Sequence, residues 1–107
     1  MDAEDFIWTP HGCKHFASST HPWVELVRST TRGPAKYLPS IDVEALERDV
    51  WQNGIPTTNG RPWKVMAFNE IIGASSGGES RWVRVELSAN TIHGHPITQQ
   101  QYERLIG

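Results

Sequence analysis

The sequence predicts a single α+β domain, with N-terminal helices packed on a small antiparallel β-sheet and a short C-terminal helix. Helical patterns occupy the first half of the chain, whereas segments rich in aromatic and β-branched residues occupy most of the second half. Helices and strands that are segregated in this way are typical of α+β folds. The length of 107 residues suits one domain over 1–107.

Two helices are predicted before the strands. The first covers about residues 22–30, because Pro22 suits the first turn of a helix. The second covers about 40–53, where Ser40 provides a cap and apolar residues recur at helical spacing: Ile41, Val43, Leu46 and Val50. The acids of this second helix are predicted to face solvent: Asp42, Glu44, Glu47 and Asp49.

Three strands are predicted after the helices, at 63–72, 80–87 and 91–97. The small polar residues of 73–79 predict a hairpin loop, and 88–90 a tighter turn, so the three strands form an antiparallel meander. Thr98 is a suitable N-cap for a last helix that ends at about Ile106.

Alternation of side chains along these strands predicts a polar strip on one face of the sheet. Val83 and Val85 point to the core, so Arg84 points away from it. His93 and His95 share one face of the last strand. Lys64 and Glu70 share one side of the first strand and are predicted to lie on the same face as Arg84 and the histidines. Alternation places Trp82 on this face as well.

The five histidines are the most informative residues, because they fall into two groups: His11, His15 and His21, then His93 and His95. Histidine titrates near neutral pH, so two groups brought together by folding could supply an acid and a base, or ligands for a metal. A single cysteine excludes an internal disulfide, and no apolar run is long enough to anchor the chain in a membrane.

The net charge of −2 does not predict a generally nucleic-acid-binding surface, so binding of RNA would depend on a local patch. The densest run of cations without an acid between them contains Arg28, Arg32 and Lys36. Trp82, on the face of Arg84, could stack on an exposed base.

The leading hypothesis for function is metal-independent cleavage of RNA. This reaction needs a base for the ribose 2′-hydroxyl, cations for the charge on the phosphorane and an acid for the leaving 5′-oxygen. Glu70, Arg84, His93 and His95 on one sheet face, approached by His15 or His21, would supply these groups without a cofactor.

Two alternatives remain open. His93 and His95, together with His11 and His15 at helical spacing, form an acceptable zinc ligand set, which would indicate a metal-dependent hydrolase or nuclease. The third hypothesis is an interaction module without catalytic activity, whose histidines lie near a binding face.

The order of these parts resembles a known group of proteins. Lys14-His15 at the opening of a helical region, a helix pair, an antiparallel sheet and the final stretch Thr91-Ile-His-Gly-His-Pro96 resemble the C-terminal toxin domains of bacterial contact-dependent inhibition and related polymorphic toxin systems. These domains include metal-independent ribonucleases of the barnase, EndoU, colicin and RelE-like superfamily.

The resemblance implies a ribonuclease toxin that acts on tRNA, is secreted as part of a larger protein, is delivered to the cytoplasm of a target cell and is neutralised by a cognate immunity protein. It implies catalytic roles for helix-borne Lys14 and His15, for the sheet residue Glu70, and for residues of the last two strands: Arg84, Thr91, His93 and His95. Binding of tRNA would then fall to Arg28, Arg32, Lys36 and Lys64, with Trp82 stacking on a base.

Overall fold

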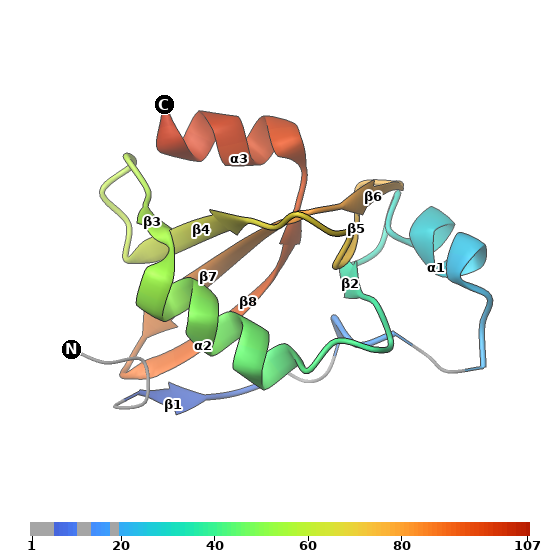
Figure 1. Ribbon diagram of the computed structural model, residues 1–107, viewed down its shortest axis with the longest axis horizontal. Coiled ribbons are helices and arrows are strands. Elements are labelled where there is room, and N and C mark those ends of the chain that lie inside the picture. The colour runs from blue at the N-terminus through green and yellow to red at the C-terminus, as the bar shows by residue number, and fades with distance from the viewer. Residues whose placement is uncertain (1–5, 11–13, 18–19) are drawn as a thin grey trace.

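The computed structural model describes residues 6–10, 14–17 and 20–107, in which the chain forms a five-stranded sheet, a three-stranded sheet and three helices (Figure 1). The predicted α+β class is confirmed. The large sheet has the order β1-β8-β7-β4-β3, with the strands β1 (Ile7–Trp8), β3 (Ile55–Pro56), β4 (Trp63–Ala67), β7 (Trp82–Ser88) and β8 (Thr91–Ile97). The small sheet has the order β2-β5-β6, with β2 (Lys36–Tyr37), β5 (Gly73–Ser75) and β6 (Gly78–Ser80).

The centre of the large sheet is the predicted antiparallel meander, since β4 pairs with β7 and β7 with β8. The turn between β7 and β8 is tight because Ala89 and Asn90 both adopt positive φ angles, of 51° and 65°. The sheet is mixed rather than purely antiparallel, because β1 runs parallel to β8.

Helix α2 (Val43–Asn53) crosses one face of the large sheet, as Figure 1 shows, and buries Val43, Val50 and Trp51 against Val83, Val85 and Ile92 of the strands. This cluster is the main core. The helix begins after Asp42, whose side chain accepts from the amide of Ala45, so Asp42 and not the predicted Ser40 is the N-cap.

Helix α3 (Gln99–Ile106) follows β8 directly and lies over the other face of the sheet, against β4 and β7. Thr98 is its N-cap, as predicted, and forms a capping box with Gln101. Helix α1 (Trp23–Ser29) agrees with the predicted first helix and packs on β5 and β6, beside the small sheet in Figure 1.

The predicted strand over 63–72 is wrong beyond Ala67. The amide of Phe68 donates to the carbonyl of Arg81, and the chain then bends at residues 69–70. The predicted loop 73–79 is itself a hairpin, because β5 and β6 pair with each other through a turn at Ser76 and Gly77. No helix in the described ranges is both long enough and apolar enough to cross a bilayer.

Candidate functional site

Imidazoles from the two ends of the chain meet at the edge of the large sheet. The rings of His15 and His95 stack with their centroids 5.0 Å apart and an interplanar angle of 29°. His95 is carried by β8, whereas His15 lies in a short turn at residues 14–16 and not in the helical region that the resemblance implied. We call His15 and His95 the histidine pair.

Backbone carbonyls orient both rings of the histidine pair. Nδ1 of His15 lies 2.7 Å from the carbonyl oxygen of Ala35, and Nδ1 of His95 lies 2.9 Å from that of Pro96. A carbonyl can only accept a hydrogen bond, so Nδ1 carries the proton in each neutral ring and Nε2 holds the lone pair. Protonation of either ring would therefore take place at Nε2.

Arg84 lies directly across the β7–β8 pairing from His95. Its guanidinium carbon is 3.9 Å from the ring centroid of Trp63 on β4, which is a stacked cation–π contact. Nε of Arg84 is buried and has no hydrogen-bond partner among the residues described. A buried donor without an acceptor is costly, so this atom favours an acceptor supplied by a ligand.

Two lysines add positive charge beside the pair. Lys14 immediately precedes His15 and is close enough to affect the titration of His95, while Nζ of Lys36 donates to the carbonyl of Lys14 at 2.5 Å. The amide of Tyr37 also donates to the carbonyl of His15, at 2.8 Å. The turn that carries His15 is thus attached to β2.

His93 belongs to a different local arrangement. Its Nε2 lies 2.8 Å from Oε1 of Glu86, the residue opposite it on β7, so this imidazole and carboxylate form an ion pair when the ring is protonated. His93 and His95 share one face of β8, as predicted, but His93 contacts Glu86 whereas His95 stacks on His15.

Burial lowers the pKa of His95, and the positive charges of Arg84 and Lys14 lower it further, while a hydrogen bond to the Pro96 carbonyl and the charge of Glu86 raise it. The net direction is downward. Burial also lowers the pKa of Arg84, and the negative charge of Glu86 raises it by a smaller amount. At neutral pH the site therefore holds a neutral His95 beside a cationic Arg84.

A pocket of about 170 Å³ opens between the Arg84 face of the sheet and helix α3. It is lined by Trp63, Arg84, His95, Ile97, Gln101, Arg104 and Leu105. Its volume is below the roughly 300–1,000 Å³ of sites that enclose a drug-sized ligand, so it suits one group of a larger ligand. The two arginines make that group an anion. We call this the α3 pocket.

Several predicted site residues lie elsewhere. Glu70 is exposed in the bend that follows β4 and is not on the sheet face. Thr91 shares a face with His95 but is four residues away along β8, about 13 Å. Lys64 is on the wrong face, because β4 places it opposite Val85, and its Nζ donates to the carbonyl of Trp51 at 2.7 Å and lies over the Trp51 ring.

Some of the predicted RNA-binding residues lie beside the histidine pair and others lie elsewhere. Lys36 is next to the histidine pair through its bond to Lys14. Arg28 lies in the last turn of α1 and Arg32 in the turn that follows; both are exposed, and α1 packs mainly on β5 and β6 rather than on the sheet that carries Arg84. Trp82 is half-buried on the Arg84 face, opposite Ile97, but does not line the α3 pocket.

The metal alternative gains no support from the part of the chain that the structure describes. No group of three or more His, Cys, Asp or Glu side chains there is arranged to hold an ion. His11, which completed the predicted zinc set, lies outside the described residues, as does the cysteine at position 13.

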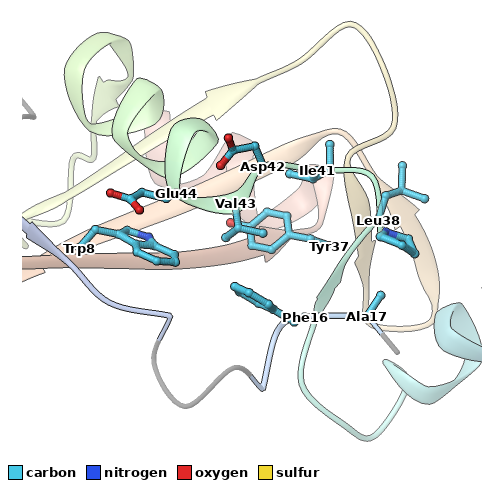
Figure 2. Close-up of a pocket in the computed structure, with 10 residues that line it drawn as sticks. Trp8, Phe16, Ala17, Tyr37, Leu38, Ile41, Asp42, Val43 and Glu44 are labelled. Carbon is cyan, nitrogen blue, oxygen red and sulfur yellow. The ribbon is translucent and has the colours of Figure 1, made fainter. Parts of the chain in front are cut away.

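A second pocket, of about 340 Å³, has a different chemistry. Figure 2 shows Trp8, Phe16 and Tyr37 around it, with Val43 between them and the carboxylates of Asp42 and Glu44 at its α2 side. Aromatic and aliphatic walls with acids at the edge do not favour a phosphate group. The α3 pocket is therefore the better candidate for binding nucleic acid.

The prediction that Glu47 faces solvent is wrong: Glu47 is 1% exposed. Its spacing from Val43 and Val50 places it on the apolar stripe of α2, and this spacing could have identified it. Sequence reasoning also missed the contributions of Trp63, Gln101 and Arg104 to the α3 pocket, because they depend on how α3 packs on the sheet.

Comparison of the chain with protein-family models, with curated proteins and with solved structures found no match.

Proposed function

We propose that this domain is a metal-independent endoribonuclease of the toxin type, which cleaves RNA by attack of the 2′-hydroxyl on the adjacent phosphate. The observation that carries the proposal is the histidine pair beside Arg84: two imidazoles with centroids 5.0 Å apart, next to a guanidinium whose buried Nε has no partner among the described residues. These are the base, the acid and the anion-binding group that the reaction requires.

His95 is the base. Its lowered pKa keeps it neutral at pH 7, and its Nδ1 is held by the Pro96 carbonyl, so Nε2 can accept the proton of the 2′-hydroxyl. The 2′-oxygen then bonds to phosphorus while the bond from phosphorus to the 5′-oxygen breaks. The products are a 2′,3′-cyclic phosphate and a 5′-hydroxyl end.

His15 is the acid that protonates the leaving 5′-oxygen. Two stacked imidazoles disfavour double protonation because like charges repel, so a His15 that carries the proton is matched by a neutral His95. Arg84, fixed on Trp63, binds the non-bridging oxygens of the phosphate as negative charge develops.

The substrate is RNA, with tRNA as the first candidate to test. Lys14 and Lys36 give the entrance of the site a positive charge that the chain as a whole lacks, since its net charge is −2. Under this proposal the domain is delivered to a target cell within a larger secreted protein, and an immunity protein protects the producing cell by covering this entrance.

The test is incubation of the purified protein with total RNA and with tRNA in EDTA, followed by analysis of the fragment ends. Cyclic-phosphate ends on RNA, with DNA left intact, are the expected result. A substrate with a single 2′-deoxyribose at the cleaved position should resist cleavage there. Intact RNA, or cleavage that EDTA abolishes, would refute the proposal.

The matched variants are His95→Ala, His15→Ala and His21→Ala. The first two remove one imidazole of the pair and are expected to lower kcat by about 100-fold or more, the usual contribution of a general acid or base. His21 is exposed beside α1 and serves as the control, with kcat unchanged. Equal activity in all three variants would exclude the assigned roles.

A further inference from the structure

We propose that Glu47 is a positioning residue that holds the two segments carrying His15 and His95 at their stacking distance. This inference deepens the proposed function. Only the expected effect on kcat rests on that function, whereas the expected effect on the histidine titrations does not. Glu47 lies on α2, on the opposite face of the sheet from the α3 pocket, and touches neither imidazole in any contact described above.

The carboxylate of Glu47 accepts hydrogen bonds from three separate elements. Oε1 accepts from Nε1 of Trp8 at 2.8 Å and from the amide of Gly94 at 3.1 Å, and Oε2 accepts from the hydroxyl of Tyr37 at 2.5 Å. One buried side chain thus joins β1, β2 and β8 to α2.

The Tyr37 bond leads to His15. The hydroxyl of Tyr37 is fixed by Glu47, and the backbone amide of Tyr37 donates to the carbonyl of His15 at 2.8 Å. The neighbouring Lys36 bonds the carbonyl of Lys14, so β2 fixes the two residues of this turn in succession. Tyr37 is 1% exposed, so the surrounding core holds its ring in place and the Tyr37 amide keeps the carbonyl of His15 at a fixed position.

The Gly94 bond leads to His95. Gly94 stands between His93 and His95, and its amide points to Glu47 while the flanking imidazoles occupy the other face of β8. Because Gly94 packs closely against the backbone of Arg84, this bond also fixes the spacing of β8 from the strand that carries the guanidinium.

The burial of a carboxylate at this position is by itself energetically unfavourable. Desolvation raises the pKa of Glu47, and its three hydrogen bonds lower it, but all three donors are neutral groups. A leucine of similar size would fill the same space without the desolvation penalty. The particular contribution of the carboxylate is therefore the fixed geometry of the three segments that it joins.

The test compares Glu47→Leu with Glu47→Gln, and uses NMR titration of the imidazole signals as a readout that does not depend on activity. The amide oxygen of the glutamine variant can still accept from Gly94 and Trp8, and its NH₂ group can donate to the hydroxyl of Tyr37. The glutamine variant is therefore expected to retain the wild-type titration of His15 and His95 and a kcat within about threefold of wild type. In the leucine variant the midpoint of His95 should rise toward the ordinary value of about 6.5, and kcat should fall by about 100-fold, a loss typical of a displacement near 1 Å.

Glu44→Leu is the matched control, because Glu44 is on the same helix but exposed, and should change neither readout. If the leucine variant does not fold, Tyr37→Phe removes only the hydroxyl contact and should shift the His15 signal while His95 moves less. A folded Glu47→Leu or Tyr37→Phe variant with unchanged histidine titrations would overturn the positioning role. If the wild-type protein leaves RNA intact while the Glu47→Leu variant shifts the histidine titrations, the ribonuclease proposal is overturned and the positioning role stands.

Discussion

Replacement of Gly94 by alanine should open the β7–β8 pairing at the row where Arg84 and His95 meet. A Cβ atom on Gly94 would collide with the carbonyl oxygen of Arg84 and lie 2.8 Å from Cγ2 of Val85. Carbon atoms are at their best separation near 3.5–4.0 Å, so the strands would have to separate by about 0.7 Å or more. One of these obstacles, Val85, is a core residue that is 0% exposed.

The expected cost is about 3 kcal/mol. Overpacking a close-packed interior costs roughly 1–3 kcal/mol, and weakening a neighbouring hydrogen bond of the ladder adds about 1 kcal/mol. In a domain of 107 residues, each kcal/mol lowers Tm by about 4–8 °C, so Tm should fall by roughly 10–25 °C. The altered spacing of Arg84 from His95 should also lower any ribonuclease activity measured well below the new Tm.

Thermal unfolding followed by circular dichroism measures this effect, with Gly78→Ala as the control. Gly78 is also a strand glycine, but a Cβ atom there would have no heavy atom within 4 Å, so its Tm should change by the equivalent of less than about 1 kcal/mol. A Gly94→Ala protein that melts within about 3 °C of wild type, a change smaller than that expected for about 1 kcal/mol, would refute the close approach of β7 and β8.

Three further outcomes follow from the site. Arg84→Lys keeps the charge but loses the planar stack on Trp63 and the Nε donor, so kcat/KM for RNA should fall by about 10–100-fold, measured by initial rates. Because the folded-state pKa of His95 is lowered, the unfolded state binds more protons than the folded state just below pH 6.5, so the stability of the wild type should drop as the pH falls through that region. Urea unfolding at pH 5 and pH 7 should show a smaller drop for a His95→Gln protein, and an equal drop would contradict the assignment. Lys14→Ala should weaken binding of tRNA and reduce the slope of log Kd against log salt by about one, and an unchanged slope would place the phosphate contacts elsewhere.

Local patterns predicted the helices well. Helix α2 is recognisable from its apolar spacing, and α3 from Thr98 as its N-cap, because caps and periodicity depend on residues only three or four positions apart. The two-residue strands β1, β2 and β3 were not predicted, since such short segments have no period and form only because β8, β5 and β4 provide partners.

The site was predicted in part. Alternation along β7 and β8 correctly placed Arg84, His93 and His95 on one face, and the approach of His15 was expected from the grouping of the histidines. The predicted face of Lys64 was wrong. Alternation fixes which residues share a side of β4, but the register with β7 decides which face of the sheet that side is on. That register is set by the bend after Ala67 and the β5–β6 hairpin, which no local pattern revealed.

Helix α3 supplies one wall of the α3 pocket but has no residue that is fully buried. Beyond its own turns it is fastened by partial packing of Tyr102, Leu105 and Ile106 and by the backbone of Thr58, which donates to the carbonyl of Leu105 at 2.9 Å. Amide protons of such an element should exchange with deuterium through local opening, before those of the central strands β7 and β8. Local opening of α3 would widen the cleft above Arg84 without unfolding the domain, so that a group larger than the resting volume could enter.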